Sequence, residues 1–363
     1  MFEATLLHTD RLTRLRERVS SAGLDAVVIS KPQNVRYVTG FTGSAGIAVV
    51  TSTQAHMVLD FRYLEQAAVQ APTFGRVYAK GPLIEGVAGV LRDLGVRRAG
   101  VEADTMPVGT FQRLQTAVSP GEVAPLEGLD ALRWQKSPDE IQTIRRAASI
   151  ADASFVDVFP LIRPGARERD IAIELEYRMK QRGADRSGFD IIVASGPRSA
   201  LPHGVASDRV IGPGEFVTID FGAVVDGYTS DCTRTLVMAP AEDRHREVYH
   251  VVLGAQEAAL AAVRAGMTGR EVDAVARTRI THAGYAEAFG HSLGHGVGLA
   301  VHEGPTLSPR EEAVLPPGAV VSVEPGVYLP GWGGVRIEDL VVIAEGGCEV
   351  LTHLPKTWLE VGT

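Results

Sequence analysis

The segment FVTIDFGAVVDGYTSDCTRTLVM, residues 216–238, predicts a β-hairpin whose two strands each carry an acidic residue. Asp226-Gly227 is a dipeptide preferred in type I′ turns, and alternating strand-like residues flank it. If this pair forms the turn, residue 222 lies opposite residue 231. Because side chains alternate between the two faces of a strand, Asp220 and Asp231 become diagonal neighbours on one face. Two carboxylates placed this way repel each other, and a shared divalent cation removes that cost.

The same pattern returns further along the chain. PGEFVTIDFG (213–222) is similar to PGAVVSVEPG (317–326), which aligns Asp220 with Glu324. The strands that follow, GYTSDCTRTLVM and GVRIEDLVVI, align Asp231 with Glu338. Upstream, GARERDIAIELEYRM and GMTGREVDAVARTRI each begin an amphipathic helix that another long helix precedes. We therefore predict an α+β domain with an internal pseudo-two-fold repeat of two helices and a strand pair.

Histidines and an arginine accompany these acids. HSLGHGVGLAVHE contains His291, His295 and His302, and His203 precedes the first strand pair. Carboxylates with one imidazole suit a pair of Mn(II), Co(II) or Zn(II) ions better than a lone Mg²⁺. Such a pair can hold a hydroxide that attacks a substrate, while a carboxylate takes the proton and a histidine stabilises the oxyanion. Arg336 shares a strand face with Glu338, so we expect it to orient that carboxylate or neutralise leftover negative charge.

The region before the repeat predicts a separate domain. Ser137, Pro138 and the acids that follow are typical of a helix start, and we place the domain boundary near residue 131. Residues 1–130 alternate strands and helices, which indicates an α/β domain with a mixed sheet, and residues 131–363 form the second domain. The expected strands of the first domain are LDAVVIS (24–30), NVRYVTG (34–40), GIAVVTS (46–52), HMVLD (56–60) and Ala99–Glu102. Its expected helices are Arg11–Ala22, Tyr63–Gln70, Leu83–Leu94 and one around Phe111–Ala117.

Composition narrows the range of partners. The 363 residues carry a formal net charge of −8, which argues against nucleic acid as a partner because phosphate binding needs a basic face. No run of apolar residues is long enough for a membrane span. The first residues lack the basic start, apolar block and cleavage site of a secretory signal, so we expect a cytoplasmic protein. Cys232 and Cys348 are too few for a disulfide framework.

These motifs together resemble the pita-bread-fold metallopeptidases, and closely the branch that holds aminopeptidase P and prolidase. The resemblance covers most of residues 131–355. YVTGFTGSAG and LDFRY also resemble the amino-terminal domain of that branch, the creatinase/prolidase N-terminal type. The motifs that carry the resemblance in the second domain are SGFDIIVASGPRSALPHG, GEFVTIDFG, DGYTSDCTRT, GHSLGHGVG, AVHE, VSVEPGVY and GVRIEDLV.

The resemblance implies a set of roles. Two divalent cations per chain, Mn(II) first among the candidates, would be bound by Asp220, Asp231, His295, Glu324 and Glu338. Asp231 and Glu338 would bridge the cations, and Glu324 would also be the general base. His203, His291 and His302 would line the substrate site and stabilise the tetrahedral intermediate, with Arg336 in support. Relatives of this branch are usually homodimers or homotetramers joined partly through the first domain, which we expect also to shape access to the active site.

Both kinds of enzyme in this branch require proline as the second residue of the peptide. A tertiary amide lacks an N–H and has a fixed φ, so a shaped pocket can select it. Many prolidases hold the carboxylate of a dipeptide with an arginine four residues after the AVHE histidine, and Thr306 stands there in this sequence. We therefore expect an Xaa-Pro aminopeptidase, with an Xaa-Pro dipeptidase as the alternative. A catalytically inactive peptide-binding module is disfavoured, because every ligand position has the expected residue type.

Overall fold

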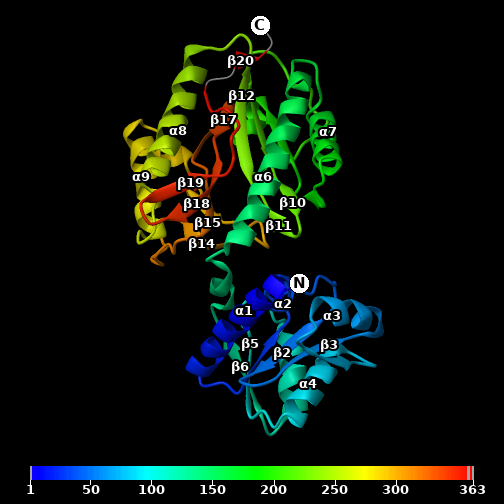
Figure 1. The fold of residues 1–363 in the computed structure, drawn as a ribbon. Coiled ribbons are helices and arrows are strands. Elements are labelled where there is room, and N and C mark those ends of the chain that lie inside the picture. The colour runs from blue at the N-terminus through cyan, green and yellow to red at the C-terminus, as the bar shows by residue number, and fades with distance from the viewer. Residues whose placement is uncertain (1, 358–359, 362–363) are drawn as a thin grey trace. The chain divides into compact units, whose positions relative to one another are not determined.

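The computed structural model describes residues 2–357 and 360–361 (Figure 1). The chain divides into two compact units, Met1–Leu132 and Arg133–Thr363. In the part of the chain described here, none of the helices combines the length and apolar character needed to cross a bilayer.

The first unit is built on a six-stranded mixed sheet with the strand order β4-β3-β2-β1-β5-β6. The pairs β1–β5, β5–β6 and β3–β4 are parallel, and β1–β2 and β2–β3 are antiparallel. The strands are β1 (Ala26–Ile29), β2 (Ile47–Thr51), β3 (Ala55–Leu59), β4 (Gly75–Tyr78), β5 (Arg98–Glu102) and β6 (Glu122–Leu126). The α-helices are α1 (Phe2–Ser21), α2 (Pro32–Thr39), α3 (Leu64–Gln70), α4 (Leu83–Asp93) and α5 (Val108–Val118). The expected α/β domain with a mixed sheet is confirmed.

One predicted strand of this unit is wrong. NVRYVTG lies in helix α2, which begins with Pro32 in its first turn and ends at Gly40 in the left-handed conformation, φ 79°. Val35 and Val38, three residues apart, are both buried, as expected for one face of a helix. The short apolar run was ambiguous, and the proline and glycine that bracket it are the signals that distinguish a helix here.

The second unit consists of two similar halves. In the first half, α6 (Pro138–Val158) and α7 (Glu168–Gln181) pack on the sheet β20-β12-β9-β8. In the second half, α8 (Asp243–Ala262) and α9 (Gly269–His282) pack on the sheet β14-β13-β15-β18-β19. Figure 1 shows the two helix pairs on opposite sides of the strands. Ser137 caps α6, as the sequence predicted, and the structure adds a capping box between Ser137 and Glu140.

The strands of the second unit form two larger sheets and two smaller ribbons. The first half contains β7 (Arg186–Ser187), β8 (Ile192–Ser195), β9 (Phe216–Phe221), β10 (Ala223–Val225), β11 (Tyr228–Thr229), β12 (Cys232–Met238) and β20 (Glu360–Val361). The second half contains β13 (Gly294–Gly296), β14 (Glu303–Leu307), β15 (Val320–Val323), β16 (Gly326–Leu329), β17 (Gly333–Arg336), β18 (Asp339–Ala344) and β19 (Gly347–Val350). The pairs β9–β12 and β15–β18 occupy equivalent places, so the predicted repeat is confirmed.

The hairpin of residues 216–238 has the predicted register. Asp226 and Gly227 both have positive φ, 46° and 70°, as a type I′ turn requires. Val225 pairs with Tyr228 between β10 and β11, and Phe221 pairs with Cys232 between β9 and β12, in the same register. Residue 222 therefore lies opposite residue 231, as expected. A Cβ at Gly222 would approach the Ser230 carbonyl oxygen to 1.9 Å, so only glycine fits at this crossing.

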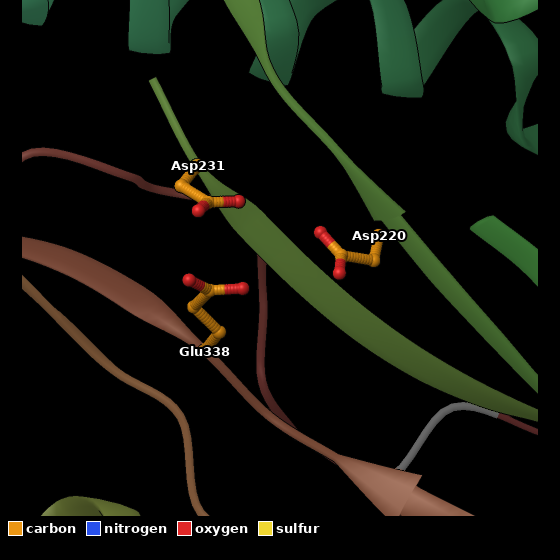
Figure 2. Close-up of side chains that lie close together, drawn as sticks. All are labelled: Asp220, Asp231 and Glu338. Carbon is orange, nitrogen blue, oxygen red and sulfur yellow. The ribbon is translucent and has the colours of Figure 1, made fainter. Parts of the chain in front are cut away.

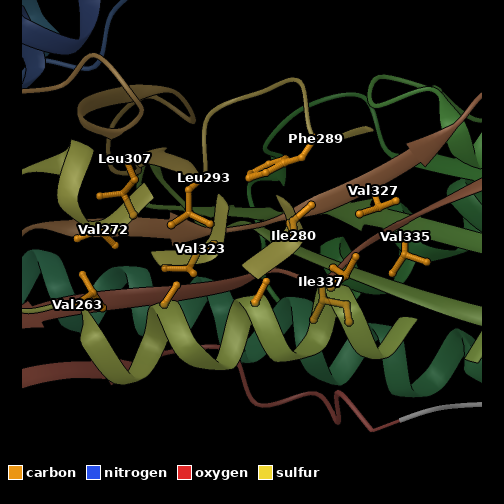
Figure 3. Packing of buried hydrophobic residues seen from close by; sticks show 14 of the residues in the cluster. Val263, Val272, Ile280, Phe289, Leu293, Leu307, Val323, Val327, Val335 and Ile337 are labelled. Carbon is orange, nitrogen blue, oxygen red and sulfur yellow. The ribbon is translucent and has the colours of Figure 1, made fainter. Parts of the chain in front are cut away.

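Each half has its own apolar core. In the second half, buried side chains of α8 and α9 pack against β15 and the β16–β17 hairpin (Figure 3). Val263, Ile280, Val323 and Val335 are all fully buried there. Burial of this kind contributes roughly 1.5–3 kcal/mol for each large aliphatic side chain, so both sheets are held firmly against their helices. The edges where the two halves meet are consequently fixed in position.

Candidate metal centre

Three carboxylates from the two halves converge in one place (Figure 2). Asp220 lies in β9, Asp231 directly precedes β12, and Glu338 directly precedes β18. One oxygen atom of each lies within 4.8 Å of the others, a spacing that allows a shared metal ion. The predicted proximity of Asp220 and Asp231 is observed, and their binding of a common cation stays a prediction.

The protein environment makes this cluster unfavourable in its ionised form. Burial, together with the charges of Glu338 and Asp220, raises the pKa of Asp231 well above its ordinary value. Burial, with Glu324 and Asp220 nearby, likewise raises the pKa of Glu338 well above its ordinary value. Asp220 Oδ1 and Glu338 Oε1 are buried without a hydrogen-bond donor among the described residues. Buried acceptors without donors are rare, and this donor set fits a divalent cation.

His295 and Glu324 lie beside the cluster. Nδ1 of His295 donates to the Gly296 carbonyl oxygen over 3.1 Å, which turns Nε2 toward the acids. Nε2 lies 3.2 Å from Glu324 and 3.7 Å from Asp231. Burial opposes ionisation of Glu324, but the hydrogen bond and charge of His295 outweigh it and lower its pKa to about 2. An imidazole whose other nitrogen donates to a backbone carbonyl has the arrangement found in most metal-ligating histidines.

Arg336, at the end of β17, contacts a different carboxylate from the one expected. Its Nη2 donates to Asp220 Oδ2 over 2.7 Å, and its Nε donates to Thr233 Oγ1 over 3.0 Å. Thr233 in turn donates to Glu338 Oε2 over 2.7 Å. The guanidinium therefore neutralises Asp220 directly and reaches Glu338 only through Thr233. Strand alternation could not reveal this, because β17 pairs with β16 in a sheet separate from the one that contains β18.

Tyr328 is a residue of the site that the sequence did not single out. Its hydroxyl accepts from Arg336 Nη1 over 3.0 Å and lies 2.9 Å from His291 Nε2. His291 Nδ1 lies 2.7 Å from the Ser292 carbonyl oxygen and must donate to it, so Nε2 accepts from the tyrosine. Burial lowers the pKa of His291, in keeping with this neutral form. Both ring nitrogens of His291 therefore form hydrogen bonds within the protein. In the sequence, Tyr328 is an ordinary residue of VSVEPGVY, and only its burial in the structure marks it as part of the site.

The predicted histidines and acids line a single pocket of about 700 Å³. His203 enters it from the loop after β8 and is exposed, and His302 enters it just before β14. The rings of His302 and His295 lie 4.2 Å apart, and burial together with the charge of His295 lowers the pKa of His302. The sequence-predicted residues that line the pocket are Asp220, Asp231, His203, His291, His295, His302, Glu324, Arg336 and Glu338.

The strand that follows His302 is anchored by buried charges. Glu303 lies 2.5 Å from Arg133 Nη1 and 2.8 Å from Lys136 Nζ, and all three side chains are almost fully buried. Removing one member would leave a buried charge uncompensated, which typically costs about 3–5 kcal/mol. The backbone next to His302 is therefore held in one conformation.

Two repeated halves that meet at a pocket of buried carboxylates define a pita-bread metallopeptidase. Residues 142–345 match the family described as metallopeptidase family M24, and residues 11–135 match the creatinase/prolidase N-terminal domain. The chain belongs to metallopeptidase family M24, so it is a metal-dependent peptidase.

Named relatives of the chain cover nearly its whole length. The Xaa-Pro dipeptidase of Pyrococcus horikoshii is 37% identical over 349 residues, which are 94% of this chain and 97% of the relative. The solved structure of an Xaa-Pro dipeptidase from Bacillus anthracis has a TM-score of 0.95 and 44% identity, covering 98% of this chain and 100% of its own. An X-Pro aminopeptidase structure from Thermotoga maritima has a TM-score of 0.89 and 39% identity, covering 96% of this chain and 99% of its own.

Proposed function

We propose that the chain is an Xaa-Pro dipeptidase, which hydrolyses the bond between the first residue of a dipeptide and the proline that follows. The proposal is carried by the convergence of Asp220, Asp231 and Glu338 within 4.8 Å in a chain of family M24. Similarity along almost the whole chain to Xaa-Pro dipeptidases of P. horikoshii and B. anthracis supports the choice of substrate.

The metal-binding part of the proposal assigns two divalent cations to this cluster. Asp231 and Glu338 would bridge them, Asp220 would complete one site, and His295 with Glu324 would complete the other. When bound, such cations lower the pKa of water and polarise the scissile carbonyl group. The oxygen-rich donor set with a single imidazole favours Mn(II), with Co(II) and Zn(II) as alternatives.

The remaining residues act on protons and on the substrate. Glu324, which is ionised at neutral pH, would accept the proton of the attacking water at a carboxylate oxygen. His302 and His203 would donate hydrogen bonds to the oxyanion that develops on the carbonyl oxygen. His291, whose nitrogens are both engaged, would instead orient Tyr328 and, through it, Arg336. This last assignment replaces the expected direct role of His291 in stabilising the intermediate.

The apolar part of the pocket suits proline. Phe189, Val205 and Val301 line it together with the carboxylates, and they offer an apolar surface for a pyrrolidine ring. The imide nitrogen of Xaa-Pro carries no hydrogen, so the pocket need not supply an acceptor there. An Xaa-Ala peptide would bury an unsatisfied N–H at the same place and would bind less well.

A second candidate is the Xaa-Pro aminopeptidase that the sequence predicted. Arg336 is the only arginine or lysine among the pocket-lining residues in the described part of the chain, and it already contacts Asp220 and Tyr328. Thr306, where an arginine could hold a dipeptide carboxylate, donates to Glu311 over 2.8 Å. A missing charge-assisted contact would cost a dipeptide about 1.5–3 kcal/mol and a longer peptide nothing. The X-Pro aminopeptidase of T. maritima, 39% identical, is compatible with this alternative.

A substrate panel tests the proposal and separates the candidates. We expect Mn(II)-dependent hydrolysis of Xaa-Pro dipeptides, none with chelator, and little for Xaa-Ala controls. A kcat/KM higher for Xaa-Pro-Xaa tripeptides than for Xaa-Pro would reject the dipeptidase in favour of the aminopeptidase. Asp231→Ala should abolish metal retention and activity together, whereas His203→Ala should retain the metal. Purified protein that binds no divalent metal would reject both candidates and indicate a peptide-binding module.

A further inference from the structure

Glu168, the first residue of α7, is a buried carboxylate that no step of the proposed reaction uses. Its side chain is 0% exposed. Oε1 accepts from the amide and hydroxyl of Ser195 over 2.8 Å and 2.7 Å. Oε2 accepts from the amide and hydroxyl of Ser207 over 3.1 Å and 2.6 Å, and from Arg198. One carboxylate therefore binds two serines that lie twelve positions apart in the chain.

The segment between these serines carries His203. Ser195 ends β8, and Ser207 lies at the far end of the loop. Arg198, which contacts Glu168, also donates to the Val205 carbonyl oxygen over 2.7 Å, so it crosses the loop from one side to the other. Loops that present a functional side chain on the surface are usually among the more mobile parts of a protein. Here a single buried charge fixes both ends of the loop and leaves the exposed histidine between them.

Asp273 on α9 has the same relation to His291 in the second half. Asp273 is 1% exposed. Its carboxylate accepts hydrogen bonds from Arg277 Nε over 2.7 Å, from Arg277 Nη2 over 2.8 Å and from the Leu293 amide over 3.0 Å. Arg277 also donates to the carbonyl oxygens of Phe289 and His291 over 2.9 Å and 2.8 Å. The carboxylate and the arginine together bind the segment that contains His291.

The two arrangements are similar, although the carboxylates do not occupy matching positions of the internal repeat, since Glu168 aligns with Gly269 and Asp273 aligns with Ala172. The helices α7 and α9 begin in the matching motifs of the two halves, and β8 and β13 each pair with the equivalent strands β9 and β15. In each half, the second helix supplies the carboxylate, and a backbone N–H at or beside the strand donates to it. A fully satisfied buried network of this kind specifies one conformation, because any other conformation would leave several buried donors without acceptors.

We propose that Glu168 and Asp273 are positioning residues that hold His203 and His291, one in each half, at the substrate pocket. The significance of this for catalysis rests on the proposed function, whereas the anchoring itself can be measured without turnover. Neutralising either carboxylate should loosen its own segment and leave the segment of the other half unchanged. Each variant therefore serves as the matched control for the other.

Hydrogen exchange of the metal-loaded full chain tests the anchoring. In Glu168→Gln, amide exchange should accelerate on the order of tenfold or more in residues 196–207 and stay unchanged in residues 289–293. Asp273→Asn should show the reverse. Glu140→Gln, a buried glutamate in the first turn of α6 that accepts from Ser137 and Tyr228, should change neither segment. Unchanged exchange in residues 196–207 of Glu168→Gln, or equal acceleration in both segments, would overturn the proposal.

Kinetics then test whether the anchor acts through the histidine. Glu168→Gln should lower kcat by up to roughly 100-fold, as misplacement of a functional group can, with its metal content retained. The same substitution made in His203→Gln should change kcat by no more than about twofold, because the residue on which it acts is already lost. Independent, multiplicative losses would refute the coupling. Wild-type protein that hydrolyses no Xaa-Pro peptide would reject the proposed function, and the exchange measurements would still decide the anchoring.

A milder substitution covers the case in which Glu168→Gln does not fold. Ser207→Ala removes one hydroxyl donor from the far end of the loop and leaves the charge pair with Arg198 in place. It should accelerate exchange in residues 196–207 by a smaller factor and show the same lack of additivity with His203→Gln. A Ser207→Ala protein that exchanges like the wild type would count against the proposal.

Discussion

The stability of the metal-free protein should depend on pH because three carboxylates share one buried site. Folded-state pKa values raised for Asp231, Glu338 and Asp220 mean that the folded chain holds protons that the unfolded chain releases. The free energy of unfolding therefore falls as pH rises from about the unfolded pKa values, near 4, toward the raised ones. For each extra proton held, the slope is about 1.4 kcal/mol per pH unit.

Among the neighbouring residues, His295 and Glu324 do not reverse this trend. His291 and His302, whose pKa values are lowered by burial, oppose it below about pH 6.5, so the fall in stability is clearest above that pH. Burial opposes protonation of His295, but its contacts with Glu324 outweigh burial and raise its pKa. The stability that His295 contributes is present below the unfolded value and is lost as pH rises through the raised one, which is the same direction. Glu324, with a pKa lowered to about 2, loses its contribution only as pH falls below the unfolded value of 4.5.

Asp231→Asn gives the decisive measurement. It removes one buried carboxylate charge from the cluster, so at pH 7.5 the chelated variant should be more stable than the chelated wild type, by about 1.4 kcal/mol for each pKa unit by which burial and the neighbouring charges raise the pKa of Asp231. The variant should also lose the stabilisation by Mn(II), which reaches about 4 kcal/mol at a thousandfold excess over Kd. Urea unfolding at pH 5.5, 6.5 and 7.5, with chelator and with Mn(II), measures both effects.

The control is Asp339→Asn, at the next position after Glu338. Asp339 is equally buried, but Arg234 and Lys356 outweigh the burial and lower its pKa. Its neutralisation should therefore destabilise the protein by about 3–5 kcal/mol at pH 7.5, the opposite sign. If chelated Asp231→Asn is less stable than the wild type at pH 7.5, the repulsion argument is refuted.

Two further substitutions address the hydrogen bonds around the site. Tyr328→Phe removes the hydroxyl between the Arg336 guanidinium and His291. It should lower kcat about tenfold with metal content unchanged, since one buried hydrogen bond is worth roughly 1–3 kcal/mol. A loss of metal would contradict this assignment. Thr233→Val keeps the shape of the side chain but removes the hydroxyl that donates to Glu338. The Mn(II) affinity measured by calorimetry should therefore fall about 10–100-fold. Unaltered affinity would show that the hydroxyl does not support Glu338 as a metal ligand.

Local rules predicted the parts of the structure that depend on one segment. The turn chemistry of Asp226-Gly227 determines the hairpin register, and the register determines which face Asp220 and Asp231 share. The start of α6 likewise follows from Ser137, Pro138 and the acids directly after them. The segment 34–40 forms a helix and not the predicted strand, because a short apolar run fits either structure and the flanking Pro32 and Gly40 favour a helix.

Contacts between segments were not accessible from sequence in the same way. Arg336 contacts Asp220 because the β16–β17 hairpin lies against the first half of the unit, a placement that no local rule specifies. Tyr328 and Thr233 belong to the site for the same reason. In the sequence each is an ordinary strand residue, and only the contact between the two halves places it at the carboxylates. The anchors Glu168 and Asp273 have ordinary helix positions, and only their burial and their partners distinguish them.

The site is asymmetric because the two halves of the repeat differ in some of the residues and elements that surround the carboxylates. Both halves supply carboxylates, yet among the described residues only the second half places a histidine, His295, within 4 Å of them, on strand β13. In the first half, the short helix η4 (Gly196–Ala200) follows β8 and packs against β17, the strand that ends at Arg336. The two ends of the cluster therefore differ in charge: a histidine lowers the pKa of Glu324, whereas burial outweighs the arginine and leaves the pKa of Asp220 raised. A symmetric scaffold thus presents one carboxylate that a histidine keeps ionised and another that a guanidinium contacts directly, and under the proposed function this difference would allow two related halves to take different roles in one reaction.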